Sequence, residues 1–418
     1  MSPRPRRALP FAVAAVLVAS QIGLLASASP TSGPPPTPVG PKGSLSPFPS
    51  VLATPADPTE APSVQARGAL LADPSTGAVL YAKAPDAPRP VASLTKVMTA
   101  LLVLERTRLD DVVTVDPEAV FTREDYGATS TLGLRAGERI TVEDLLYGML
   151  LGSANDAAVA LAIHVSGSVE AFVRLMNRRA TELGMSSTRF ASASGLDDRG
   201  RSTPRDLFRL TRVANADPVF TRITATRERS ITAPRGPARQ IQNRNALLWL
   251  YPGAFGTKTG FTAAAGSCLI ASAERDGRTL VAVLLHDGAS EFSDAAALLN
   301  YGFDGFEERT VVRAGDPRGV VRIRGGSVPV EAGAGLLGWV PVAGALRETV
   351  KVDPRAAFPP APGERVATLR IDAPAAAVGV VPLVVSSVPP PPQRTGPWWA
   401  RAGVSVWRAA AGAVRALT

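Results

Sequence analysis

Histidine and cysteine are almost absent from this chain of 418 residues. It has two histidines, His164 and His286, and one cysteine, Cys268. A zinc site usually takes three or four His, Cys or acidic ligands, so the scarcity argues against zinc chemistry. One cysteine cannot form an internal disulfide, and Cys268, which lies in an apolar run, is predicted to be a packed core thiol.

Lysine is scarce as well. Only five of the 45 basic residues are lysines, at positions 42, 83, 96, 258 and 351. Arginine stays protonated in proteins, whereas lysine can lose its proton and act as a base. Lysine is therefore expected where arginine cannot replace it. The net charge of +9 would suit an anionic wall polymer or a lipid surface, although scattered arginines are also typical of a solvated exterior. No nucleic-acid partner is predicted.

The first 63 residues have the composition of an export signal and a spacer. Three arginines precede an apolar run at residues 9–26, and an Ala-Ser-Ala cleavage pattern ends at residue 28. We expect a signal peptide over 1–28, with an uncleaved membrane anchor as the alternative. Residues 29–63 are rich in Pro, Ser, Thr and Gly, which predicts a disordered linker. The protein is thus expected to be exported to the cell wall or the outer face of the cytoplasmic membrane.

The other end of the chain has an amphipathic pattern. After a Pro-rich linker at 389–397, residues 398–418 place Arg401, Arg408 and Arg415 seven positions apart, on one face of a helix. Tryptophans and small apolar residues occupy the opposite face. This pattern is typical of a helix that lies in a membrane interface. The alternative is a helix that packs on the protein's own surface.

Between these ends the sequence predicts two domains. Residues 64–305 favour an α+β fold in which one antiparallel sheet packs against helical layers, because strand patterns stand at both ends and helical patterns between them. The strands are predicted at 68–72, 78–82, 266–273 and 279–285, and the helices at 93–106, 142–151, 154–165, 169–183, 204–215 and before residue 301.

Residues 306–388 favour a small all-β domain. Ala367, Leu369 and Ile371 alternate with polar residues, as on a half-buried strand, and valine-rich runs recur between Gly- and Pro-containing turns. We find no candidate catalytic residue in this domain.

The first motif with chemical meaning is Ser93-Leu94-Thr95-Lys96, which opens a predicted helix. Positions i and i+3 share a helical face, so the Ser93 hydroxyl and the Lys96 amine can come within hydrogen-bond reach. A serine hydroxyl is a weak nucleophile until a base takes its proton, and a lysine held neutral by burial and a neighbouring cation can be that base. A helix start also offers free N–H groups for a developing oxyanion. The alternative is a capping serine beside a surface lysine.

The second motif is Ser153-Ala154-Asn155, at the join of two predicted helices. Here Ser153 can relay a proton, and the Asn155 amide can hold a carbonyl of the substrate. Serine and asparagine are also ordinary capping residues at such a join, so this motif alone is weak.

The third motif is Lys258-Thr259-Gly260, which comes just before the apolar strand predicted at 266–273. Gly260 leaves room for an extended peptide to approach the strand edge. Lys258 and Thr259 offer a cation and a hydroxyl to a terminal carboxylate. The alternative is a turn beside a strand.

In this order the three motifs resemble the active-site signature of penicillin-recognising serine enzymes. The residues around them, at 92–100, 153–158 and 256–262, are similar to those of low-molecular-mass D-alanyl-D-alanine carboxypeptidases, peptidase family S11, and so is the stretch Asn243-Arg244-Asn245. The resemblance covers residues 64–305. The β domain and the terminal helix stand where such enzymes often carry a β-rich domain and a membrane anchor.

The resemblance implies an acyl-enzyme mechanism without a cofactor. Ser93 would attack the carbonyl between the last two D-alanines of a peptidoglycan stem peptide, with Lys96 as the base. Ser153, helped by Lys258, would pass the proton to the departing D-alanine. The resemblance also implies an oxyanion hole formed by the N–H groups of Ser93 and Phe261. Lys258 and Thr259 would hold the carboxylate, and a β-lactam would acylate Ser93 and stay bound.

One departure from the family concerns a loop. Where the family usually has Asn-Pro, this chain has Ser192-Ala193, which puts the loop conformation in doubt. Three alternatives to the carboxypeptidase remain: a β-lactamase, an endopeptidase that cuts cross-links, and a wall-binding protein with an inactive enzyme domain. No omega-loop carboxylate is found for the first, and the intact scarce lysines argue against the last.

Overall fold

The computed structural model describes residues 60–122, 129–232, 238–343, 345–373 and 376–387. All of them belong to one of the chain's two compact units, Phe48–Thr418. The predicted signal peptide, both Pro-rich linkers and the predicted terminal helix lie outside the described residues, apart from the last few positions of the first linker.

The centre of the first domain is a five-stranded antiparallel sheet in the order β2-β1-β9-β8-β7. The predicted first hairpin is confirmed: its turn is held by the Asp73 carboxylate, which accepts from the Ser75 N–H at 2.6 Å and the Thr76 hydroxyl at 3.0 Å. The strands are β1 (Gly68–Ala72), β2 (Val79–Lys83), β7 (Ala254–Thr262), β8 (Gly266–Arg275) and β9 (Arg278–Asp287).

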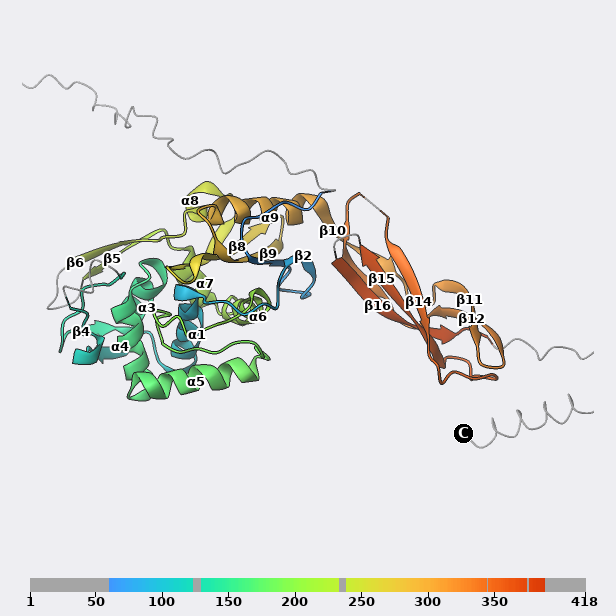
Figure 1. Cartoon of the computed structure of the whole chain (residues 1–418), viewed down its shortest axis with the longest axis horizontal. Helices are drawn as coiled ribbons and strands as arrows, with labels where there is room; N and C mark the ends of the chain where they lie inside the picture. The colour runs from blue at the N-terminus through green and yellow to red at the C-terminus, as the bar shows by residue number, and fades with distance from the viewer. Residues whose placement is uncertain (1–59, 123–128, 233–237, 344, 374–375, 388–418) are drawn as a thin grey trace, which may run out of the picture. The chain divides into compact units, whose positions relative to one another are not determined.

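Helices cover both faces of this sheet (Figure 1). Ile270 and Val283 face the larger helical layer, whereas Leu269 and Leu284 face the smaller one, so the middle of β8 and β9 is apolar on both faces. The larger layer contains η1 (Ala92–Thr95), α1 (Lys96–Arg106), α3 (Val142–Leu151), α4 (Asn155–Ser166), α5 (Val169–Glu182), α6 (Pro204–Ala214) and α7 (Pro218–Ala225). The smaller layer contains α8 (Leu247–Leu250) and α9 (Glu291–Gly305).

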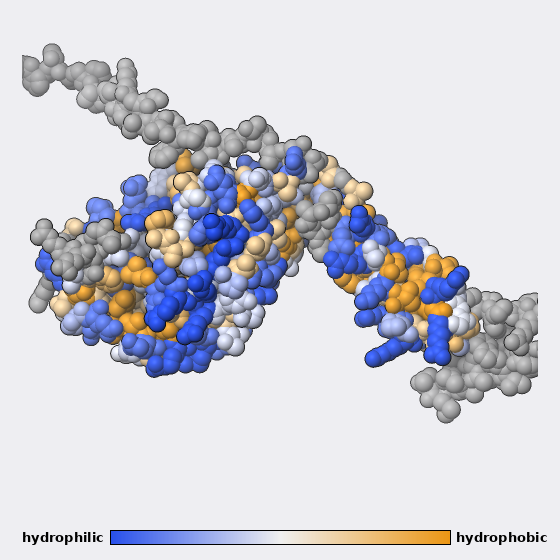
Figure 2. Space-filling model, viewed as in Figure 1, coloured by the Kyte–Doolittle hydropathy of each residue, from blue (hydrophilic) through white to orange (hydrophobic). Residues whose placement is uncertain are grey.

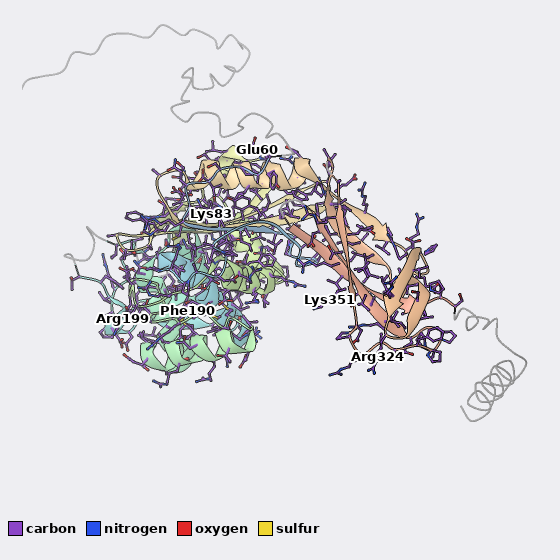
Figure 3. The ribbon with its side chains drawn as sticks, turned by 45° about the vertical axis from the view of Figure 1, so that its right-hand side comes forward. Glu60, Lys83, Phe190, Arg199, Arg324 and Lys351 are labelled. Atoms are coloured by element: carbon purple, nitrogen blue, oxygen red, sulfur yellow. The ribbon has the colours of Figure 1, made fainter. Side chains whose placement is uncertain are left out.

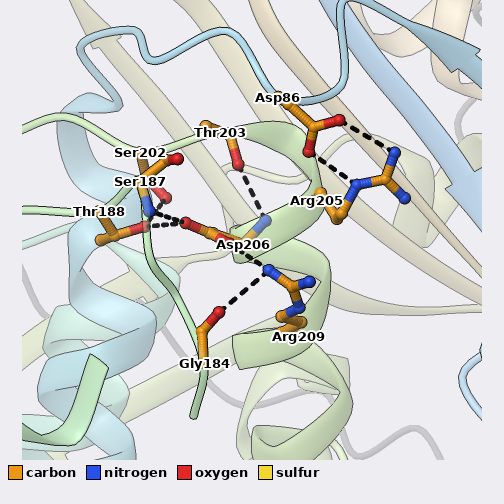
Figure 4. A network of polar contacts seen from close by, with 9 residues as sticks. All are labelled: Asp86, Gly184, Ser187, Thr188, Ser202, Thr203, Arg205, Asp206 and Arg209. Carbon is orange, nitrogen blue, oxygen red and sulfur yellow. Dashed lines mark hydrogen bonds and ion pairs between the residues drawn. The ribbon is translucent and has the colours of Figure 1, made fainter. Parts of the chain in front are cut away.

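Polar side chains fix where the helices begin. Thr141, Ser168 and Thr203 each accept a hydrogen bond from a backbone N–H in the first turn of α3, α5 and α6. In α6 the buried Asp206 also accepts from the Ser187 N–H at 2.9 Å and the Thr188 hydroxyl at 2.8 Å, which ties the helix to the preceding segment (Figure 4).

Several short elements were not predicted. They are α7, α8, η2 (Pro117–Ala119), the pair β3 (Val112–Thr114) and β4 (Arg139–Thr141), and the pair β5 (Glu228–Thr232) and β6 (Ala238–Gln242). These strands have five residues or fewer, too short for a clear alternating pattern.

Two sequence predictions about the motifs need correction. Lys258-Thr259-Gly260 does not precede a strand but lies within β7, at the edge of the sheet. Ser93 does not open an α-helix: it lies in the 3₁₀ turn η1, directly before α1. In both cases contacts between distant segments override a weak local signal, since β7 packs against η1.

The α9 helix ends at Gly305, and the strands that follow form the predicted all-β region. Ala367, Leu369 and Ile371 are buried in its core, as their alternation predicts. One sheet has the order β11-β12-β16-β15-β14, and β10 pairs with β13. The strands are β10 (Phe306–Val312), β11 (Pro317–Ile323), β12 (Gly326–Ala332), β13 (Leu336–Pro341), β14 (Arg347–Val352), β15 (Arg365–Ala373) and β16 (Ala376–Val385). The α+β fold followed by a small all-β region is confirmed; the predicted domain limits stay a proposal.

On the face in Figure 2, apolar residues gather in patches on the first domain and on the β region, among hydrophilic ones. Within the described ranges no single helix is long and apolar enough to cross a membrane. The bent pair α4 and α5 passes that test by length and composition, but their apolar side chains belong to the core.

Candidate active site

Ser93 and Lys96 meet at the start of α1. The Lys96 side chain is completely buried, and its Nζ lies 2.9 Å from the Ser93 Oγ. The same nitrogen donates to the Asn155 Oδ1 at 2.6 Å and to the backbone carbonyl of Ser194 at 2.7 Å. A hydroxyl and an amine therefore stand within hydrogen-bond distance, as a nucleophile and its base would need to, and two further groups hold the amine in place.

The surroundings favour a neutral Lys96. Burial, and then the charges of Lys258 and Arg244, hold its pKa well below the usual range of an amine, while Asp156 acts in the opposite direction. The Asn155 and Ser194 oxygens can only accept, so they fix two N–H bonds of a neutral amine. The remaining position, a lone pair in that state, faces the Ser93 hydroxyl. This geometry allows Lys96 to take the Ser93 proton.

Asn155 and Ser153 lie where α3 ends and α4 begins. The Asn155 N–H donates to the Ser130 carbonyl at 2.8 Å, and because its Oδ1 faces Lys96, its Nδ2 has no partner among the described residues. Ser153 has a left-handed backbone (φ +62°), a conformation that costs energy for a residue with a side chain and often occurs at functional sites. Its hydroxyl has no hydrogen bond to the described residues, so no contact with Lys96 or Lys258 is seen.

The third motif places its residues on alternating sides of β7. Lys258 is buried, and burial together with the charge of Arg244 lowers its pKa to about 7. Its Nζ donates to the Thr259 carbonyl at 3.0 Å, and the Phe261 side chain is 70% exposed. A Cβ on Gly260 would lie 3.1 Å from the Ser93 backbone nitrogen, so glycine allows β7 to approach η1 this closely.

Sequence reasoning missed the loop that supplies the Ser194 carbonyl. Gly195 has φ +84° and lies against η1, where a Cβ would come within 1.9 Å of the Ala92 carbonyl oxygen. At 192–193, where the chain departs from the family, two hydrogen bonds hold the loop: the Ser192 hydroxyl accepts from the Gly195 N–H, and the Thr99 hydroxyl donates to the Ala193 carbonyl at 2.6 Å. A backbone carbonyl has no sequence signature. Only the resemblance to the family at Gly195 could have indicated this contact.

The role of Arg244 was also missed. This arginine is exposed, yet its charge lowers the pKa of both Lys96 and Lys258. Its positive charge therefore disfavours the protonated form of both lysines. The sequence signal was its place in Asn243-Arg244-Asn245, which belongs to the family resemblance.

A buried polar clamp holds the segment that contacts Asn155. The Asp156 carboxylate accepts from the backbone N–H groups of Leu132 and Leu134 at 2.9 and 3.1 Å. From the other direction, Arg239 donates to the Leu132 carbonyl at 2.8 Å and forms a buried ion pair with Glu138 at 2.7 Å. This segment therefore has little freedom to move beneath the site.

The described residues contain no cluster of three or more His, Cys, Asp or Glu side chains that could hold a metal ion. Cys268 is buried in β8, and burial raises the pKa of its thiol to about 12. A thiol in that state is a poor nucleophile. This agrees with the predicted packed core residue.

The site combines a serine beside a buried lysine, an asparagine that contacts the same lysine, and a cationic edge strand. This combination defines a serine hydrolase of the penicillin-binding fold class. Residues 55–289 match the model of the D-alanyl-D-alanine carboxypeptidase family, peptidase S11. The chain belongs to this family.

Individual relatives support the assignment over most of their length. The chain is similar to the D-alanyl-D-alanine carboxypeptidase DacC of Escherichia coli, with 34% identity over 78% of this chain and 84% of DacC. It is 37% identical to the D-alanyl-D-alanine endopeptidase of Pseudomonas aeruginosa over 55% of this chain and 74% of that protein. The crystal structure of the carboxypeptidase DacD from Francisella tularensis, 24% identical, has the same fold, with a TM-score of 0.66 over 79% of this chain and 95% of that one.

Proposed function

We propose that this protein is a serine-type D-Ala-D-Ala carboxypeptidase that removes the terminal D-alanine from peptidoglycan stem peptides. The observation that carries the proposal is the buried Lys96 amine, 2.9 Å from the Ser93 hydroxyl and held by two acceptor oxygens. The proposed reaction class is that of the family to which the chain belongs. The proposal includes β-lactams as inhibitors that acylate Ser93.

In the proposed acylation, Ser93 Oγ attacks the carbonyl carbon of the penultimate D-alanine while its proton moves to the Lys96 amine. The N–H groups of Ser93 and Phe261 receive the oxyanion. The C–N bond then breaks, and the proton held by Lys96 reaches the leaving D-alanine nitrogen through Ser153, helped by Lys258: Ser153 gives its own proton to the nitrogen and receives the one from Lys96. Water afterwards attacks the ester, which releases the shortened peptide and restores the Ser93 hydroxyl.

Substrate binding is assigned to the edge of β7. The strand is unpaired on one side, so an extended peptide can add to it through backbone hydrogen bonds. Lys258, Thr259 and the neighbouring Arg244 are cationic or hydroxyl groups suited to the terminal carboxylate. The free Asn155 Nδ2 can donate to a peptide carbonyl.

The test is D-alanine release from diacyl-Lys-D-Ala-D-Ala by the full chain and by Ser93→Ala. Release by the parent alone supports both the activity and the nucleophile. Equal release by the variant, or labelled penicillin that still attaches to Ser93→Ala, would refute the assignment of Ser93.

A second candidate is a DD-endopeptidase that cuts cross-links, because a relative of 37% identity carries that name. Digestion of dimeric muropeptides separates the two: a carboxypeptidase leaves the cross-link intact and trims only free pentapeptides. A β-lactamase would differ by releasing the penicillin adduct quickly. Asp156, a carboxylate close to Lys96, accepts from backbone N–H groups and is not free to activate water for that step.

Action on peptidoglycan requires a location outside the cytoplasmic membrane. The proposal therefore includes export directed by residues 1–28 and contact of residues 398–418 with the membrane surface. Both rest on the sequence pattern alone.

A further inference from the structure

A cavity of about 510 Å³ lies beside α5, away from the serine. Its lining comes from three separate segments: α5, residues 189–191 and the turn at residue 199. Figure 3 labels Phe190 and Arg199, which lie on this part of the domain near α5. The volume is within the range of small-molecule sites, roughly 300–1,000 Å³. The lining consists of Val173, Arg174, Asn177, Arg189, Phe190, Ala191 and Arg199.

The ionisable residues that line this cavity are all positively charged. Arg174, Arg189 and Arg199 are its only ionisable lining residues. Arg199 pairs with the neighbouring Asp197, whereas Arg174 and Arg189 have no ion pair among the described residues. Two uncompensated guanidinium groups on opposite segments attract an oxyanion, and their planar donors suit phosphate or carboxylate oxygens.

Hydrogen bonds fix the backbone around the cavity, whereas its three arginine side chains are exposed. The Asn177 amide donates to the Phe190 carbonyl and accepts from the Phe190 N–H, each at 2.9 Å, which fastens the Phe190 segment to α5. Arg189 exchanges two backbone hydrogen bonds of 2.8 Å with Arg201. The preceding Thr188 is anchored to Asp206 in the network of Figure 4. A ligand therefore meets a preformed backbone and has to order only the arginine side chains, so less of its binding energy goes into ordering the protein.

We propose that this cavity binds a phosphate ester on a small polyol or sugar, with the phosphate between Arg174 and Arg189 and the carbon skeleton against the partly exposed apolar residues Val173 and Ala191. A bare anion would use the arginines but leave the apolar floor uncovered. A neutral polyol would leave the guanidinium charges unpaired. The phosphate can belong to a free phosphomonoester or to a phosphodiester unit of a wall polymer, and the proposal does not depend on the carboxypeptidase activity.

The test is isothermal titration calorimetry of the full chain with glycerol 3-phosphate, glycerophosphoglycerol, glycerol and inorganic phosphate at low salt. We expect glycerol 3-phosphate to bind more tightly than inorganic phosphate, and no heat from glycerol. Binding of the diester as tight as that of the monoester identifies a polymer unit as the source, whereas selective binding of the monoester identifies a free phosphate ester.

The decisive variant is Arg174→Ala with Arg189→Ala, which should weaken glycerol 3-phosphate binding about 100-fold, or about tenfold for each charge-assisted contact. Its matched control is Arg178→Ala with Arg322→Ala, two exposed arginines outside the cavity whose removal changes the net charge equally. Equal affinity in both double variants, or failure of every phosphate ester to bind the parent, overturns the proposal. Penicillin acylation of each variant shows that it is folded.

Discussion

Burial, neighbouring charges and hydrogen bonds all act on the Lys96 side chain. The Asn155 and Ser194 oxygens would also bind an ammonium ion, so hydrogen bonding alone does not select the neutral base. Burial and the charges of Lys258 and Arg244 favour the neutral amine, because each disfavours the protonated form of Lys96. The same lysine would be an ordinary cation on the surface.

The first prediction concerns this base. Lys96→Arg should lower D-alanine release by about 100- to 10,000-fold, because arginine keeps its proton and cannot act as a base. The matched control is Lys83→Arg, since Lys83 is exposed and donates only to the Val64 carbonyl. Initial rates and circular dichroism of both variants check the prediction; full activity of Lys96→Arg would assign the base elsewhere.

The second prediction concerns pH. If Lys96 must be neutral and Lys258 charged, kcat/KM rises as pH passes the lowered pKa of Lys96 and falls above about 7, where Lys258 loses its proton. Lys258→Arg keeps the charge at every pH and should remove the falling limb. A falling limb that stays near pH 7 in this variant would show that another group causes it, even if the absolute rate has dropped.

At the scale of elements, the catalytic groups are held by segments that carry no chemistry themselves. The clamp of Asp156 and Arg239 fixes residues 132–134, and through the Ser130 carbonyl this segment reaches Asn155. In the same way, the loop that contains Gly195 positions the Ser194 carbonyl, which is the second acceptor of the Lys96 amine. Precise placement of the base thus depends on contacts between parts of the chain more than 90 residues apart, as between Lys96 and Ser194.

The third prediction tests the clamp. Glu138→Gln leaves the buried Arg239 charge without its partner and should destabilise the protein by about 3–5 kcal/mol. The control Glu143→Gln breaks the more exposed pair with Arg222 and should cost about 1 kcal/mol or less. Urea denaturation of both variants measures the difference, and equal losses would mean that the Glu138 pair is not effectively buried.

The sequence predicted the long elements well and the short ones poorly. The bounds of α3 were predicted to the residue, because Thr141 caps the helix and a mostly apolar run ends it at Leu151. β7 was missed, since Gly, Thr and Lys have no strand pattern and this strand is set by packing against η1. In the site, Ser93 and Lys96 were recognisable from spacing, whereas the Ser194 carbonyl was not, because its contribution comes from the backbone.

At the scale of the whole molecule, the proposed substrate and the proposed attachment belong to the same place. Peptidoglycan is an immobile polymer, so an enzyme held at the membrane surface would meet only the stems within its reach. Residues 398–418 are the segment assigned to this attachment, with Arg401, Arg408 and Arg415 on one predicted face.

The last prediction is that the full chain binds vesicles that contain anionic phosphatidylglycerol. Each arginine near such a surface contributes about 1 kcal/mol, so replacing these three by alanine should weaken binding about 100-fold. Alanine at three exposed arginines of the β region, Arg322, Arg324 and Arg355, changes the net charge equally and should have little effect. Co-sedimentation measures both, and binding of the parent should fall in 1 M salt, where the screening length is only about 3 Å. Equal binding by the two triple variants would place the contact elsewhere and favour the terminal helix as an element that packs on the protein itself.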